Sequence, residues 1–267
     1  MRLLALFCLL IFPFFCSSIA RAEVFQYFDE NGTLIVTDNP FGTKKKKPHT
    51  NIDISKGIIP LEIKAKELRS SLIEDVFYDY YPVSAKNYHE AVNSVSLNGP
   101  YDEKENKNYA GQTTWNLGLS YKFDYSYKIS GSKIYILTNI FDVEFKSYIS
   151  VLLPSLSENS TLSARDLENW NSFLQGLLDH EHDHVKIARE SSFRDEAMQK
   201  IATLKEFTFN YDPSSNIDEL IRNTVESETA KIGCDMSKKI KELNDEYDRL
   251  TDHGLKPDKK DVFFNRW

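Results

Sequence analysis

The sequence predicts an α+β fold in which an antiparallel β-sheet is followed by a helical C-terminal half. Two long segments, 111–127 and 133–153, are rich in β-forming residues that alternate along the chain, which is typical of antiparallel strands with one buried face. After Pro154, apolar residues recur every three or four positions, as on the buried side of a helix. Strands therefore come first and helices second, and this order favours the α+β class.

The first 22 residues have the features of a cleaved signal peptide. Arg2 supplies a positive charge, residues 3–15 form a nearly unbroken apolar stretch, and Ala20-Arg21-Ala22 provides a small-x-small cleavage site. The apolar stretch is short for a membrane span and contains Pro13, although an uncleaved anchor is the alternative interpretation. We therefore expect an exported chain, periplasmic or secreted, with no stable membrane span after cleavage.

The composition of the remaining chain limits the classes of function. Without the two arginines of the signal peptide, the 33 basic residues fall to 31 against 40 acidic ones, a formal charge of −9. This charge disfavours nucleic acid as a partner, and the local run Lys44 to Lys47 is interpreted as a solvated linker. Cys234 is the one cysteine left after signal cleavage, so no internal disulfide is expected.

A small β-hairpin segment is predicted at residues 23–42. Two short β-rich runs flank Asn31-Gly32, a dipeptide that favours tight hairpin turns because both residues tolerate positive φ. A ribbon this small is marginal alone, so we expect it to pack on another element. The segment resembles the N-terminal domain of exported bacterial proteins known as domain of unknown function 4124. Residues 43–57 predict a linker, and residues 58–267 the main domain.

Within the main domain, short elements precede and long helices follow the two β segments. Ser163 with Asp166 resembles a helix-capping pair, and Gly254 is a plausible stop for the last helix. In chain order, the other predicted elements are a strand at 58–63, a helical turn at 67–74, a strand at 78–83, a short helix at 87–96, an amphipathic helix through 167–177, a break at 212–214 and a long helix at 217–250.

The motif that carries chemistry is H-E-x-x-H, formed by His180, Glu181 and His184. On a helix the two histidines project from the same side one turn apart, the spacing at which two imidazoles can bind one zinc ion. Glu181 is rotated by about 100° and is therefore free to accept a proton from a zinc-bound water. The motif predicts a zincin-like metallopeptidase domain with zinc as cofactor. His182 points elsewhere and is expected to be exposed or a partner of a ligand.

A catalytic zinc needs a third protein ligand, which must come from further along the chain. Ile187 and Glu190 stand where the extended metzincin pattern has a glycine and a third histidine. His49 lies in the linker and His89 in the short helix, whereas His253 ends the last long helix, which an antiparallel return would bring to the motif. The carboxylate alternatives are Glu190, Glu226, Glu228 and Asp248.

The segment from Tyr81 to Gly254 resembles domain of unknown function 922, a bacterial family described as predicted secreted zinc-dependent proteases. The matching pieces, in order, are Tyr81-Pro82-Val83, Asn98-Gly99-Pro100, Gly111 to Trp115, Leu153-Pro154, Trp170 with the H-E-x-x-H motif, and Tyr247-Asp248 with Thr251 to Gly254. The resemblance implies peptidase chemistry and supports His253 as the third ligand. Many relatives carry a cysteine in the β region that this chain lacks.

The resulting hypothesis is a secreted zinc-dependent peptidase with a peptide or protein substrate. His180, His184 and His253 hold zinc, while Glu181 activates water and protonates the leaving amine. Tyr247 either donates a hydrogen bond to the developing oxyanion or is a buried core residue. The strand near Thr113 is either an edge for an extended peptide or an ordinary sheet strand. Two alternatives remain: a cell-wall peptide amidase, and an exported binding or assembly protein with a structural or vestigial metal site.

Overall fold

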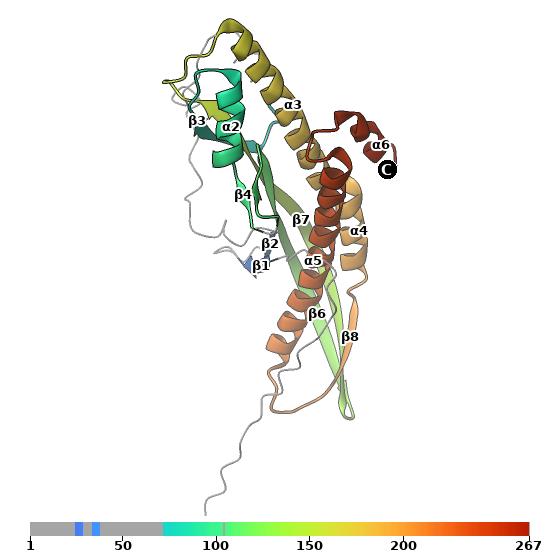
Figure 1. Ribbon diagram of the computed structural model, residues 1–267. Helices are drawn as coiled ribbons and strands as arrows, with labels where there is room; N and C mark the ends of the chain where they lie inside the picture. Colours follow the sequence, from blue (N-terminus) through green and yellow to red (C-terminus); the bar gives the residue numbers. More distant parts are fainter. Residues whose placement is uncertain (1–24, 29–33, 38–71, 104, 267) are drawn as a thin grey trace, which may run out of the picture.

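The computed structural model describes residues 25–28, 34–37, 72–103 and 105–266 (Figure 1). The predicted signal peptide and linker lie outside this part of the chain, as does the predicted strand at 58–63. No helix among the described residues combines the length and the apolar character that a membrane span requires.

A six-stranded sheet forms the centre of the molecule. Its order is β1-β2-β6-β7-β3, with β8 pairing along another part of β7. The strands are β1 (Phe25–Phe28), β2 (Leu34–Thr37), β3 (Val76–Val83), β6 (Gln112–Ser130), β7 (Lys133–Leu156) and β8 (Glu206–Asn210). The hairpin β1–β2 joins the sheet through β6, which confirms that this segment packs on another element.

The sheet is mixed, so the prediction of an antiparallel sheet is right for every pairing except one. β3 runs parallel to β7, from Val76 opposite Ile149 to Val83 opposite Leu156. A parallel pair needs a long connection, and here α2 and the whole of β6 lie between the two strands in sequence. The apolar pattern of β3 shows that one face is buried but carries no information on strand direction.

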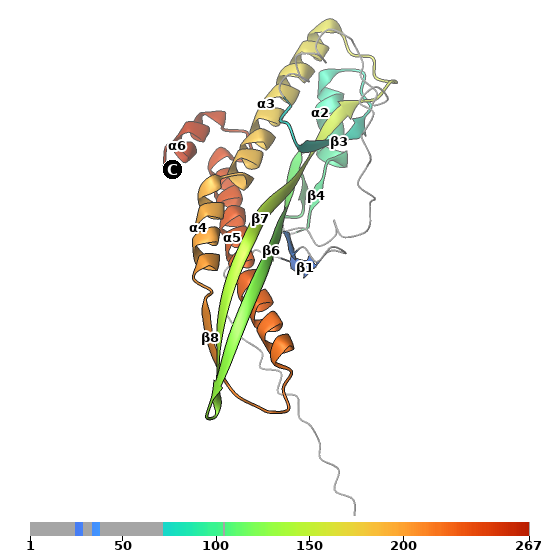
Figure 2. The same ribbon diagram turned by 180° about the vertical axis from the view of Figure 1, so that it is seen from behind.

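The two predicted β segments form one long antiparallel hairpin. β6 and β7 pair from Gln112–Leu152 to Ser130–Lys133, and Gly131 takes a positive φ of 62° in the turn. At the start of β6 and the end of β7, alternate residues are buried, namely Trp115, Leu117 and Leu119 on β6 and Ile149, Val151 and Leu153 on β7. This face packs against α3 and α5, and Figure 2 shows the opposite face with the helices behind the strands.

Helices dominate after β7, as predicted. They are α3 (Ala164–Ala188), α4 (Ser191–Ala202), α5 (Ile217–Thr251), the 3₁₀ turn η2 (Pro257–Lys259) and α6 (Lys260–Phe264), while α2 (Tyr88–Asn98) and the two-residue strands β4 (Tyr101–Asp102) and β5 (Lys107–Asn108) precede the hairpin. α3 begins at the predicted cap, where the Ser163 hydroxyl accepts a hydrogen bond from the Asp166 amide at 3.2 Å.

β8 interrupts the predicted order of strands followed by helices. Its five residues pair with β7 between Lys133 and Leu137, and Phe207 and Phe209 pack with the buried Ile134 and Ile136. A five-residue run between two helices carries too few alternations to be recognised from the sequence.

Candidate metal centre

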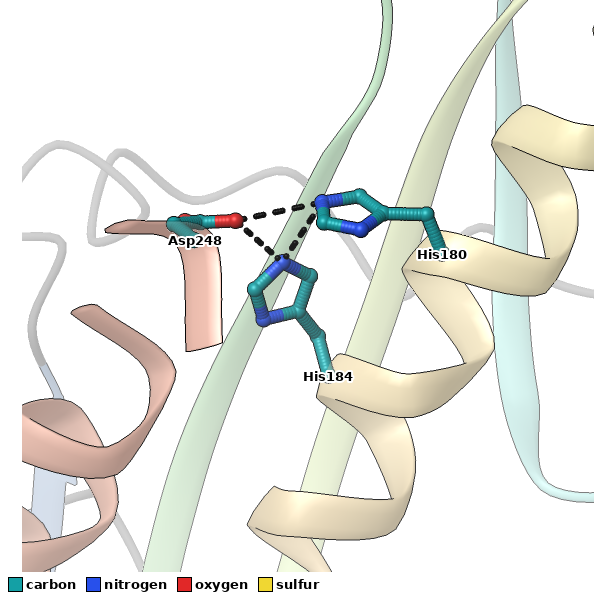
Figure 3. A group of neighbouring side chains, drawn as sticks. All are labelled: His180, His184 and Asp248. Carbon is teal, nitrogen blue, oxygen red and sulfur yellow. Dashed lines mark hydrogen bonds and ion pairs between the residues drawn. The ribbon is translucent and has the colours of Figure 1, made fainter. Parts of the chain in front are cut away.

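The histidines of the motif and one carboxylate converge between α3 and α5. Figure 1 shows the C-terminal part of α5 beside α3. His180 Nε2 and His184 Nε2 lie 3.1 and 3.0 Å from Asp248 Oδ1, and 3.2 Å from each other (Figure 3). These three residues form a group that could hold a metal ion. Among the carboxylate alternatives, Asp248 is the one that the fold brings to the motif.

His184 is oriented by an amide one turn before Asp248. His184 Nδ1 lies 2.7 Å from Asn244 Oδ1, and the Asn244 amide nitrogen donates to the Ile240 carbonyl at 2.8 Å. This second bond turns the Asn244 oxygen towards the imidazole, so Nδ1 carries the proton and Nε2 faces the group. Asn244 was not predicted from the sequence, although its spacing of four from Asp248 places both residues on one side of α5.

His180 is held by close packing. Its ring stacks on Tyr247 with centroids 5.1 Å apart and planes 21° apart. On another side, a Cβ added to Gly254 would lie 3.1 Å from His180 Cγ, so the backbone of the chain leaving α5 lies directly on the imidazole. Gly254 also has a φ of 83°, and both properties favour glycine here. His180 Nδ1 is buried without a hydrogen-bond partner among the described residues.

The charges of the group are strongly coupled. Burial alone would lower the pKa of His184, but the hydrogen bond and the negative charge of Asp248 outweigh it and raise the pKa to about 9. Burial alone would raise the pKa of Asp248, yet the two histidines hold it far below its ordinary value. Without a metal ion, protonated His184 therefore supplies the positive charge that stabilises the Asp248 carboxylate.

We expect the metal-free protein to lose stability as the pH rises from about 6.5 to about 9. The folded-state pKa of His184 lies above its ordinary value, so its contribution is complete below this window and lost above it. The loss is on the order of 3 kcal/mol. Urea unfolding of chelator-treated protein across this pH range measures it. Asp248→Asn removes the charge that raises the pKa, and an equally steep loss in this variant would contradict the assignment.

Glu181 is buried between α3 and the start of β6. Its side chain is 3% exposed, and the Thr113 hydroxyl donates to Glu181 Oε2 at 2.7 Å. Burial raises the pKa of this carboxyl, while the charges of His184 and His180 and the bond from Thr113 act in the opposite direction. A carboxyl tuned in this way can both accept and return a proton. The structure thus places Glu181 beside the metal group without making it a ligand of that group.

The Glu181 side chain occupies space that is free because Gly111 has no side chain. An added Cβ would lie 2.6 Å from Glu181 Oε1 and 3.0 Å from Leu177 Cδ1. We expect Gly111→Ala to displace Glu181 and to destabilise the fold by about 1–3 kcal/mol, because a packed site cannot accept an extra methyl group. Gly176→Ala on α3 is the matched control, since its Cβ would meet nothing within 4 Å. Equal thermal melting temperatures for the two variants would contradict this prediction.

His253 does not join the group of three but lies at its exposed side. His253 Nδ1 is 3.7 Å from Asp248 Oδ1, and His253 Nε2 is 3.3 Å from the Tyr109 hydroxyl, which donates to the Glu105 carboxylate. The residue follows the end of α5 with a φ of 51°, directly after Asp252 at 53°. Left-handed backbone at two successive non-glycine residues is strained and holds the imidazole at this position.

The other predicted site residues take different places. The Tyr247 hydroxyl donates to Asp183 Oδ2 at 2.6 Å, so its ring, and not its hydroxyl, contacts the histidines. Glu190 caps α4 by accepting a hydrogen bond from the Ser192 amide at 3.3 Å. His182 is half-buried and lies 2.8 Å from the Tyr78 hydroxyl, outside the group of three. His89 is exposed on α2, and His49 lies outside the described residues.

Comparisons with known proteins give one match. A family model described as a bacterial protein of unknown function (DUF922) matches residues 78–254, about two thirds of the chain. No curated protein and no solved structure matches. The matched residues include most of β3, the β6–β7 hairpin and all three members of the metal group. They end at Gly254, whose backbone lies against the His180 ring.

Proposed function

The chain belongs to the DUF922 family, whose function is unknown, and we propose from its site that it is a zinc-dependent hydrolase of peptide bonds. The observation that carries this proposal is the convergence of His180, His184 and Asp248 beside the buried carboxyl of Glu181. Two imidazoles and one carboxylate are a ligand set typical of catalytic zinc, which keeps a further position open.

The distances support zinc as the metal. Ligand atoms at 2.0–2.1 Å from a tetrahedral zinc are about 3.3 Å apart. The separations in the group are 3.0, 3.1 and 3.2 Å, so the three donor atoms already lie close to this arrangement. Asp248 is 28% exposed and the histidines only 8–10%, so solvent reaches the group from the Asp248 side.

In the proposed reaction, a zinc ion bound here would supply Lewis-acid activation of water and of the scissile carbonyl. Glu181 accepts a proton from the attacking water and later returns it to the leaving amine. Thr113 engages Oε2, which leaves Oε1 as the oxygen for this proton. We propose Asp248 as the third ligand and place His253 next to the open side.

A peptide as the substrate class is supported by the edge of β6. Thr113 contacts Glu181, and β2 pairs with β6 from Asn116 onwards, so the described strands leave Gln112 to Trp115 unpaired on the side away from β7. An extended peptide can add to such an edge through backbone hydrogen bonds. Together with the predicted signal peptide, this open strand edge supports an exported peptidase that is periplasmic or secreted.

Zinc content and hydrolysis of denatured casein by the mature wild-type chain test the proposal together. One zinc per chain and turnover that a chelator abolishes would support a peptidase. Turnover of cell-wall peptides but not of casein would favour the amidase alternative. A wild-type chain that binds no zinc would refute the metalloenzyme.

A second candidate is a binding or assembly protein with a structural metal site. His253 favours it, because its Nδ1 lies only 3.7 Å from Asp248 Oδ1 and a small movement would supply a fourth ligand. Four protein ligands close a zinc site to water. X-ray absorption of the zinc-loaded chain distinguishes the candidates, since a peptidase requires three protein ligands and an open position, whereas four protein ligands would favour the structural site.

A further inference from the structure

The segment 257–264 lies beyond the residues that the family model matches, yet it packs against the residues of the site. Figure 1 shows α6 beside the C-terminal end of α5. Phe263, 1% exposed, places its ring edge-on to Tyr247 with centroids 5.1 Å apart. The Phe264 ring lies 5.7 Å from the same tyrosine, and Lys186 Nζ lies 3.8 Å above that ring. The segment 257–264 is therefore part of the packing around the ligands.

One buried carboxylate joins the three helices that meet here. Asp183 on α3 is 5% exposed, and its Oδ2 accepts the hydrogen bond from Tyr247 on α5. The same oxygen lies 2.8 Å from Lys260 Nζ on α6. Because a carboxylate removed from water is stable only when a cation and hydrogen bonds replace its hydration, Lys260 keeps Asp183 inside the protein.

Asp183 and its hydrogen-bond partner Tyr247 are each adjacent to a metal ligand in sequence. Asp183 precedes His184 on α3, and Tyr247 precedes Asp248 on α5 while stacking on His180. The hydrogen bond between Asp183 and Tyr247 therefore fixes the offset of the two helices at the level where both contribute ligands. Movement of α5 along α3 would break this bond and separate Asp248 from the two Nε2 atoms.

We propose that Lys260 and Asp183 are positioning residues of the metal site, and that segment 257–264 holds the ligand-bearing helices in register. When the charge of Lys260 is removed, Asp183 turns towards water and withdraws from Tyr247. The ligands then have to be brought together by the metal itself, which lowers the affinity. This inference rests on the proposed zinc site but concerns metal affinity and not hydrolysis.

Lys260→Met tests the inference, because it keeps the apolar stem and removes the charge. We expect zinc to bind about 10-fold or more weakly, the size of effect that partners of metal ligands usually have. Competition with a chromogenic chelator measures the affinity, and the visible spectrum of the cobalt-substituted chain reports the ligand geometry. Lys260→Arg is expected to retain wild-type affinity. Lys259→Met, which removes the neighbouring lysine paired with the exposed Asp258, is the matched control.

Unchanged zinc affinity in folded Lys260→Met, with or without a lower melting temperature of the metal-free form, would overturn the positioning role and leave the proposed function standing. If Lys260→Met does not fold, Tyr247→Phe replaces it, since this change deletes only the hydroxyl that binds Asp183. Wild-type affinity in that variant would equally overturn the inference. Absence of zinc binding by the wild type would overturn both the proposed function and the positioning role.

Discussion

Glu181→Gln is expected to abolish hydrolysis of denatured casein while zinc stays bound. Glutamine preserves the shape of the side chain and can still accept the hydrogen bond from Thr113, but it cannot take up a proton. Loss of a general base lowers the rate by roughly 10²- to 10⁴-fold. Casein turnover and zinc content, measured on the same preparation, check both parts of the expectation.

Asp179→Asn is the matched control for this variant. Asp179 lies on the same helix but is exposed and accepts a hydrogen bond from Gln175. Its replacement is expected to leave both rate and zinc content unchanged. Full activity in Glu181→Gln would exclude Glu181 as the base, and loss of its zinc would show that Glu181 supports the ligands instead.

Asp248→Ala and His253→Ala are expected to differ sharply in zinc affinity. Asp248 Oδ1 lies within 3.1 Å of both Nε2 atoms, so its removal deletes one of three ligands. We expect the affinity to fall by more than about 100-fold, beyond the 10- to 100-fold effect of residues that only orient ligands. His253 lies outside the group, and its replacement is expected to change the affinity by less than about 10-fold. Chelator competition measures both.

Asp245→Ala controls for the loss of a carboxylate on α5, because Asp245 is exposed and pairs with Lys241. It is expected to bind zinc like the wild type. The reverse result, in which His253→Ala loses zinc and Asp248→Ala retains it, would identify His253 as the third ligand.

The local part of the site could be predicted from the sequence. His180, Glu181 and His184 lie within five residues of one helix, and helical geometry alone determines how they project. The cap at Ser163 and the two strands of the long hairpin could be predicted for a similar reason, since capping and alternation depend only on neighbours along the chain.

The choice between Asp248 and His253 could not be made in this way. It depends on the offset between α3 and α5, which is set by packing contacts such as Tyr247 with Asp183. α5 also ends at Thr251, and the left-handed backbone at Asp252 and His253 turns the chain away from the helical path. The expected antiparallel return of the last helix brings this end of α5 to the motif, but it does not determine which side chain there faces the two histidines.

The parallel pairing of β3 with β7 has a consequence for how the molecule folds. Val76 and Ile149 are partners although α2 and all of β6 separate them in sequence, so the pairing must close a long loop. The β6–β7 hairpin closes only a short turn and forms locally. We expect β3 to join the sheet after the β6–β7 hairpin has formed. Because Tyr78 of β3 bonds to His182, the helix that bears the metal ligands gains this neighbour only when β3 joins.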